Sequence, residues 1–177
     1  MDQAGGDRFD GDRQDGWMAE QPMAVFDVDG VVADVRHRLR HVARRPKNWI
    51  AFFAAADRDP ALADGVELVR KYAADHRVVW LTGRPERLRP VTERWFAEQG
   101  LPAGRLLMRP DHDRRPARDY KLGQLRGLSK DGIVAVVVDD DPAVVKRLTA
   151  EGFPVRLADW VGYEDSLRRA QERDGRT

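Results

Sequence analysis

Residues 133–138 read Ile-Val-Ala-Val-Val-Val, an apolar run without a single polar side chain. A strand with one face in water alternates apolar and polar residues, whereas a strand covered on both faces is apolar throughout. The run therefore predicts an inner strand of a sheet that carries helices on both faces. Sheets of this kind are typically parallel, because the helices are the crossovers that join one strand to the next.

Shorter apolar runs alternate with helical patterns along the rest of the chain, which supports the same interpretation. We therefore expect an α/β, Rossmann-like fold, with a parallel five-stranded sheet flanked by helices and right-handed crossovers. The expected strands are 23–28, 78–81, 106–108, 133–138 and 155–157, and the expected helices are 48–56, 64–75, 86–99, 119–127, 142–151 and 164–173. Turns or helix ends are expected at Gly65, Gly100, Gly127 and Gly152, and first-turn prolines at Pro85 and Pro142.

The length of 177 residues fits one domain with a substantial core. Residues 1–20 are rich in Gly, Asp and Gln and have no apolar period, so a disordered tail is expected there and a single domain over 21–177. The chain has no cysteine, which excludes disulfides, thiolate metal sites and cysteine nucleophiles. A net charge of +1 argues neither for nor against nucleic acid.

No apolar stretch approaches the length of a membrane span, and the start lacks the basic-then-apolar pattern of a secretion signal. We therefore expect a cytoplasmic protein that has no membrane partner.

Two carboxylates, Asp27 and Asp29, follow the apolar residues 23–26 and precede Gly30. In an extended chain, side chains two residues apart point the same way and lie roughly 6–7 Å apart. Two ionised carboxylates at that spacing repel, and a divalent cation between them would remove the repulsion. One carboxylate could then attack an electrophile while the other handles a proton. The alternative interpretation is an acidic turn after a strand.

Three consecutive acids, Asp139, Asp140 and Asp141, follow the apolar run 133–138. Asp139 and Asp140 would complete an oxygen-ligand site with Asp27, and a few carboxylates supplemented by water and phosphate oxygens are typical of Mg²⁺. Asp141 precedes Pro142 and is expected to be the N-cap of the next helix. The alternative is that all three acids serve as caps and solvated turn residues.

Thr82, Gly83 and Arg84 follow another strand and precede a predicted helix. A hydroxyl group and a glycine backbone before a helix are suited to binding phosphate oxygens, and Arg84 could add a bidentate contact. The alternative is an ordinary strand-to-helix turn. Lys121 lies near the start of the helix before residue 133, where it could neutralise phosphate and keep a nucleophilic carboxylate ionised. A lone lysine on a helix more often faces solvent.

These four segments, in this order, resemble the four motifs of the haloacid dehalogenase (HAD) superfamily over about residues 21–160. Within the superfamily the chain resembles the 3′-phosphatase domain of phage-type polynucleotide kinase-phosphatases. No G-x-x-x-x-G-K-[ST] segment of a kinase half occurs, and Val31 replaces a threonine that often follows the first motif. The shared details are Arg36 and Arg38, Asn48-Trp49 with Phe52-Phe53, Met108-Arg109, and Asp139-Asp140 followed by Val144-Val145.

The resemblance implies a HAD fold with a small cap inserted after the first strand, at about residues 31–60. It implies that Asp27 is a nucleophile that forms an aspartyl-phosphate, and that Asp29 protonates the leaving alcohol and then activates water. Mg²⁺ would be held by Asp27, by Asp29 through its backbone carbonyl, and by Asp139 or Asp140. The transferring phosphoryl group would be bound by Thr82, Gly83 and Lys121, with Arg84 as a further phosphate contact. Because expelling an alkoxide needs a proton whereas expelling a halide does not, Asp29 favours a phosphatase over a dehalogenase.

The segment from Val35 to Lys47 holds six Arg or Lys residues, two His and no acid. Its charge, including that of Arg36 and Arg38, could follow a nucleic-acid backbone, or it could be a solvated surface. Trp49, Phe52 and Phe53 could stack on bases, but their helical spacing more often means core packing, and we favour that interpretation.

The sequence thus predicts a Mg²⁺-dependent phosphomonoesterase whose substrate is a nucleotide or a polynucleotide 3′-phosphate, so that nucleic-acid 3′ ends are the expected partners. One alternative is a phosphatase or phosphotransferase for small molecules such as nucleotides or sugar phosphates. A second alternative is a nucleic-acid-binding protein without catalysis, because a fold can be used for either purpose.

Overall fold

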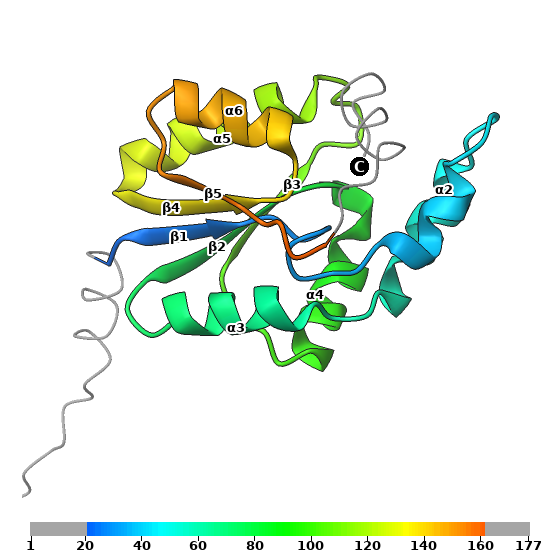
Figure 1. Cartoon of the computed structure of the whole chain (residues 1–177), viewed down its shortest axis with the longest axis horizontal. Coiled ribbons are helices and arrows are strands. Elements are labelled where there is room, and N and C mark those ends of the chain that lie inside the picture. The colour runs from blue at the N-terminus through cyan, green and yellow to red at the C-terminus, as the bar shows by residue number, and fades with distance from the viewer. Residues whose placement is uncertain (1–20, 162–177) are drawn as a thin grey trace, which may run out of the picture.

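The computed structural model describes residues 21–161 and contains one parallel five-stranded sheet in the order β3-β2-β1-β4-β5 (Figure 1). The α/β Rossmann-like fold expected from the sequence is confirmed. The central strand β1 pairs with β2 on one side and with β4 on the other. The strands are β1 (Met23–Phe26), β2 (Arg77–Pro85), β3 (Arg105–Arg109), β4 (Val134–Asp139) and β5 (Val155–Leu157).

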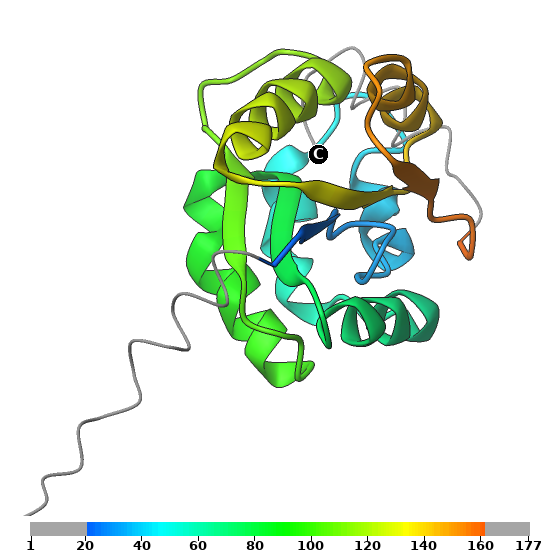
Figure 2. The same cartoon turned by 90° about the vertical axis from the view of Figure 1, so that its left-hand side faces the viewer.

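Helices cover both faces of the sheet, as Figures 1 and 2 show. One face carries α3 (Ala63–Tyr72) and α4 (Arg89–Glu98), and the other carries α5 (Ala117–Asp131) and α6 (Pro142–Ala150). Each face of the sheet has its own hydrophobic core, and strand β1 contributes side chains to both, because successive side chains of a strand point to opposite faces. Ala24 and Phe26 lie in the cluster with α3 and α4, and Met23 and Val25 lie in the cluster with α5 and α6.

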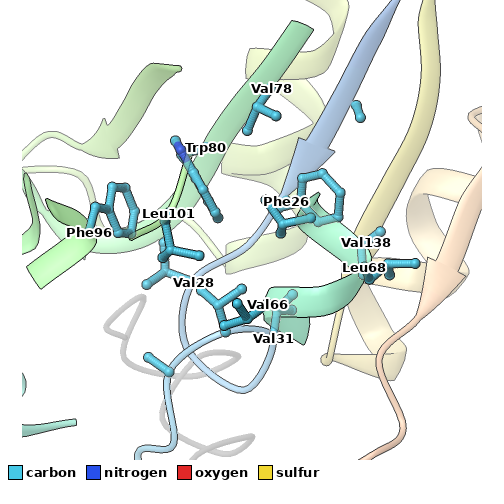
Figure 3. Packing of buried hydrophobic residues seen from close by; sticks show 14 of the residues in the cluster. Phe26, Val28, Val31, Val66, Leu68, Val78, Trp80, Phe96, Leu101 and Val138 are labelled. Atoms are coloured by element: carbon cyan, nitrogen blue, oxygen red, sulfur yellow. The ribbon is translucent and has the colours of Figure 1, made fainter. Parts of the chain in front are cut away.

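The core on the α3 and α4 face is built around aromatic rings (Figure 3). The ring of Trp80 lies 6.0 Å from that of Phe26 and 4.5 Å from that of Phe96, measured between centroids. Gly65 lies in the first turn of α3, where a Cβ atom would come within 1.8 Å of the Val31 carbonyl oxygen. A glycine is therefore needed there so that α3 can approach the chain that follows β1.

Residues 31–60, predicted as a cap, contain the 3₁₀ helices η1 (Arg36–His41) and η2 (Ala56–Arg58) and the short helix α2 (Trp49–Ala54). We call residues 31–60 the cap segment. Trp49, Phe52 and Phe53 pack with one another and with Val35, Leu39 and Val42 in a separate small core, so the packing interpretation of the aromatic residues is confirmed. The ring of Trp49 lies 5.6 Å from that of Phe52 and 5.9 Å from that of Phe53.

Several predicted boundaries were wrong. Pro85 does not open a helix: it ends β2, where it pairs with Arg109, because the residue before a proline favours extended backbone. The short helix η3 (Glu86–Leu88) follows, and Pro90 takes the first-turn position of α4. Gly127 lies inside α5, which continues to Asp131, so it marks no helix end. Ile133 precedes β4, and its side chain is 73% exposed.

The predicted tail at 1–20 and the predicted helix at 164–173 lie outside the described residues. Within residues 21–161, no helix has both the length and the apolar character that crossing a membrane requires.

Candidate active site

The carboxyl ends of β1, β2 and β4 bring the predicted motifs to one edge of the sheet. Asp27 follows β1 directly, and its backbone N–H donates to the carbonyl of Val138 in β4 at 3.0 Å. Asp139 is the last residue of β4, and Thr82 lies in β2. Because all three strands are parallel, residues far apart in the sequence meet at this edge, which is where α/β folds place their ligand sites.

Carboxylate oxygens of Asp27, Asp139 and Asp140 lie within 4.8 Å of one another, and all three carboxylates are buried. Among residues 21–161, Asp140 Oδ1 finds no hydrogen-bond partner. Burial, opposed by Lys121 and reinforced by Asp27, raises the pKa of Asp139 to about 7. Burial, together with the charges of Asp139 and Asp27, also raises the pKa of Asp140 well above its ordinary value. Three crowded and buried carboxylates fit a divalent cation, which would neutralise them and take oxygen ligands.

Lys121 lies one turn into α5 and reaches into this acidic cluster. Its Nζ atom donates to Asp27 Oδ2 at 2.7 Å and to Asp139 Oδ2 at 2.6 Å, and the residue is buried. Burial alone would lower the pKa of Lys121, but the charges of Asp139 and Asp27 outweigh burial and raise that pKa. The ammonium group is therefore charged at neutral pH, and the solvent-facing alternative is wrong.

Gly30 brings the turn after Asp29 against Asp140. Its φ angle is +77°, and a Cβ atom there would lie 2.1 Å from Asp140 Oδ2. A side chain at this position would therefore meet both an unfavourable backbone conformation and a carboxylate of the acidic cluster. The lack of a side chain at Gly30 thus leaves room for the Asp140 carboxylate in the acidic cluster.

The carboxylate of Asp29 faces two arginines rather than the acidic cluster. Its Oδ1 atom accepts from Arg38 Nη2 at 2.9 Å and from Arg84 Nη2 at 2.6 Å. Burial would raise the pKa of Asp29, but the charges of Arg38 and Arg84 together hold it below its ordinary value. Asp29 is therefore ionised at neutral pH in this arrangement. Its Oδ2 atom has no hydrogen-bond partner in the part of the chain that the structure describes.

Asp59 completes this arrangement, and sequence reasoning missed it. Its carboxylate accepts from Arg38 Nε at 2.8 Å and from Arg84 Nη2 at 2.7 Å, and the ring of His37 lies 2.7 Å away. The backbone carbonyl of Asp59 accepts from Trp95 Nε1 at 2.8 Å. Asp59 follows Arg58 and precedes Pro60, a context typical of any exposed turn, so the sequence held no signal for a buried acid.

The remaining predicted residues occupy distinct places. Thr82 and Gly83 are buried, and the Thr82 hydroxyl accepts from the Arg84 backbone N–H at 3.2 Å. The Arg84 guanidinium, expected to contact phosphate, is held by Asp29 and Asp59 in this structure. Arg36 is exposed and pairs with Asp34 at 2.6 Å. Arg38 is fully buried, because two carboxylates draw it inward, so it does not lie on a surface that could follow a nucleic-acid backbone.

Comparison with known proteins gives a family match and structural matches. A family model described as the polynucleotide kinase PNKP phosphatase domain matches residues 21–157. A chain of the Pnkp1/Rnl/Hen1 RNA repair complex is 23% identical, with a TM-score of 0.67 over 81% of this chain and 44% of that one. The present chain thus spans less than half the length of that relative. No curated protein sequence matches.

Two hydrolases show the same fold at lower identity. The HAD-hydrolase YfnB from Bacillus subtilis, in a structure bound to magnesium, is 9% identical with a TM-score of 0.54, over 77% of this chain and 87% of that one. A hydrolase from Streptococcus pneumoniae TIGR4 is 10% identical with a TM-score of 0.51, over 85% and 98%. The family match covers most of the chain, and the four HAD motifs lie at one edge of the sheet. The chain therefore belongs to the HAD-type family of polynucleotide kinase PNKP phosphatase domains.

Proposed function

We propose that this phosphatase is a Mg²⁺-dependent phosphomonoesterase that works through an aspartyl-phosphate on Asp27. The observation that carries the proposal is the position of Lys121, buried between Asp27 and Asp139 beside a third carboxylate. Phosphoryl transfer depends on in-line positioning and on neutralising the charge of the transferring group, and this site concentrates the groups for both.

The chain's own residues fit a magnesium ion. Asp27, Asp139 and Asp140 would hold it with the backbone carbonyl of Asp29, and the neutralised carboxylates would no longer repel one another. When bound, the ion supplies positive charge to the phosphoryl oxygens. Burial raises the pKa of Asp27 even though Lys121 opposes it, so the lysine alone does not offset the desolvation of the carboxylate.

Asp27 acts as the nucleophile in the proposed reaction. One carboxylate oxygen forms a bond to phosphorus as the phosphorus–oxygen bond of the ester breaks, and the departing alcohol oxygen takes a proton from Asp29. Water then attacks the phosphorus atom and gives a proton to Asp29. The bond between phosphorus and the Asp27 oxygen breaks, so that inorganic phosphate leaves and the Asp27 carboxylate is restored. Lys121, Thr82 and the Gly83 backbone bind the transferring group while both steps proceed.

The two arginines explain how Asp29 can change its protonation. In this structure they keep Asp29 ionised, whereas the first step needs it protonated. A phosphate dianion beside Thr82 would compete with Asp29 for Arg84, and its negative charge would raise the pKa of Asp29. Substrate binding would therefore favour the protonated carboxyl group that the first step requires.

The proposed substrate class is a nucleotide or polynucleotide 3′-phosphate. The family match and the likeness to an RNA repair complex support this choice, and so does the basic cap segment beside the site. A cytoplasmic location stays a prediction.

Hydrolysis of p-nitrophenyl phosphate with Mg²⁺, with and without a chelator, tests the proposed reaction. We expect turnover that stops on chelation and in the Asp27→Asn variant. Asp57→Asn, which removes one carboxylate at an exposed position away from the acidic cluster, is the matched control. Equal turnover by the Asp27→Asn variant would reject the assigned nucleophile. The substrate class is tested by comparing kcat/KM for a 3′-phosphorylated oligonucleotide with kcat/KM for a set of sugar phosphates. A lower value for the oligonucleotide would reject the substrate class.

A further inference from the structure

The exposed side of the cap segment carries positive charge that the site does not use. From Val35 to Ala56 the chain holds six Arg or Lys residues and no Asp or Glu. Arg36 and Arg38 pair with Asp34, Asp29 and Asp59. Arg40, Arg44 and Arg45 are exposed, and no acid within residues 21–161 forms an ion pair with them. We call these three residues the cap arginines.

The cap arginines lie on a continuous path from the candidate active site. The segment begins beside Asp29, and Arg38 in η1 contacts that carboxylate. The cap arginines follow along η1 and the loop that joins it to α2, which projects away from the sheet in Figure 1. A ligand that has one end at Asp27 and extends outward along η1 would meet the cap arginines.

A hollow on the same loop offers space for a flat group. It has a volume of about 570 Å³ and is lined by Arg45, Pro46, Lys47 and Trp49. The Nζ atom of Lys47 lies 5.6 Å from the centroid of the Trp49 ring. Trp49 is 9% exposed, and the small part of it that lines the hollow lies beside Arg45 and Lys47. Cations next to an aromatic side chain are a combination with which proteins bind single-stranded nucleic acid.

We propose that the exposed side of the cap segment binds a single nucleic-acid strand upstream of its 3′ end. The cap arginines bind phosphodiester groups of the strand, and the hollow beside Trp49 holds one nucleoside. A base can enter such a hollow only when it is unpaired and unstacked, so the ligand is a single strand rather than a duplex. This proposal rests on the proposed function, because it places the terminal 3′-phosphate at Asp27.

The triple variant Arg40→Gln, Arg44→Gln, Arg45→Gln tests the proposal. Each neutralised phosphate of a single strand contributes about 0.7 to the slope of log affinity against log salt, so losing three contacts lowers the slope by about 2. The affinity of the wild type for a 3′-phosphorylated oligonucleotide should therefore fall roughly 20-fold more than that of the variant between 50 and 200 mM salt. The KM of the variant for the oligonucleotide should rise at low salt, with its kcat unchanged.

The matched control removes three charges at the opposite edge of the sheet. Arg70 and Lys71 lie in the last turn of α3 and Lys130 in the last turn of α5, and all three are exposed. The variant Arg70→Gln, Lys71→Gln, Lys130→Gln should keep the wild-type KM and salt slope for the oligonucleotide. Both triple variants should hydrolyse p-nitrophenyl phosphate like the wild type and should keep its melting temperature.

An unchanged oligonucleotide KM and salt slope in the cap variant would overturn the proposal and leave the proposed function standing. An equal loss in both triple variants would also overturn it, because the effect would then come from overall charge. If the wild type hydrolyses no phosphomonoester, the proposed function fails. In that case, fluorescence anisotropy with a labelled oligonucleotide that lacks the 3′-phosphate tests strand binding by the cap segment on its own. Binding that is lost only in the cap variant supports the strand site. Equal binding by the wild type and both triple variants contradicts it.

Discussion

Asp59 Oδ2 lies 2.7 Å from Arg84 Nη2, and both side chains are fully buried. The same carboxylate also accepts from Arg38, and both arginines donate to Asp29. Two carboxylates and two guanidinium groups thus form a cluster whose formal charges balance. The cluster ties the cap segment to β2 and holds Asp29 in place beside Asp27.

Asp59→Asn should destabilise the fold and impair catalysis. Removing one member of a buried ionic cluster leaves an uncompensated charge, so we expect a loss of about 3 kcal/mol in the free energy of unfolding. Because Arg38 and Arg84 would then bind Asp29 alone, its pKa should fall further, and the pH profile of kcat should shift to lower pH. Chemical denaturation and pH–rate profiles measure the two effects. Asp57→Asn, at an exposed position two residues away, should change neither.

Lys121→Met should abolish most of the activity. Methionine fills a similar volume but leaves Asp27 and Asp139 without their shared donor, and removing one such charge-stabilising group costs about 10²–10³ in kcat. Steady-state hydrolysis of p-nitrophenyl phosphate gives the comparison. Lys130→Met, an exposed position on the same helix, is expected to match the wild type. A near-normal kcat in the Lys121 variant would contradict its assigned role.

Gly30→Ala should disrupt the acidic cluster specifically. The new methyl group would meet Asp140 Oδ2, in addition to the strain of a positive φ angle, which amounts to about 1–2 kcal/mol. Isothermal titration with Mg²⁺ should show binding to the wild type and a large loss in the variant. Gly152→Ala separates the two causes, because Gly152 has a φ angle of +86° but no atom of residues 21–161 lies within 4 Å of a Cβ atom built there. Equal loss of Mg²⁺ binding in both variants would mean that the contact with Asp140 is unimportant.

Tyr120 should make the free energy of unfolding depend on pH in the alkaline range. Its side chain is fully buried beside Lys121, and burial raises its pKa from 10.0 to about 12. An unfolded chain releases this proton near pH 10, so the stabilising contribution is complete below pH 10 and is lost as pH rises towards 12. The loss should reach roughly 2–3 kcal/mol at pH 12. Denaturation of the wild type and of Tyr120→Phe at pH 9 and pH 12 should show the smaller decline in the variant; parallel declines would contradict the shifted pKa.

Sequence reasoning found the parts of the site that follow strands. An apolar run that ends in an acid places that acid at the carboxyl edge of a parallel sheet, which is how Asp27 and Asp139 could be predicted to meet. Asp141 was expected to be the N-cap of the next helix for a similarly local reason, and its side chain accepts from the Ala143 N–H at 2.8 Å.

Contacts between irregular segments could not be predicted in this way. Arg38 and Asp59 are 21 positions apart and Arg84 and Asp59 are 25 apart, and none of the three stands in a repeating pattern. Their burial depends on mutual charge neutralisation, which becomes visible only when the cap segment is folded against β2. Arg38 is one of six basic residues between Val35 and Lys47. No neighbouring residue in the sequence indicates that Arg38 is buried whereas Arg36 is exposed.

The most direct test of the account is to identify the residue that carries the phosphoryl group during turnover. Rapid acid quenching of the wild type with Mg²⁺ and p-nitrophenyl phosphate, followed by peptide mass spectrometry, should find phosphate on Asp27. The Asp27→Asn variant should show neither the modification nor turnover. Steady turnover by the wild type with Asp27 unmodified at every quench time, together with turnover by the variant, would contradict the central claim that Asp27 is the nucleophile.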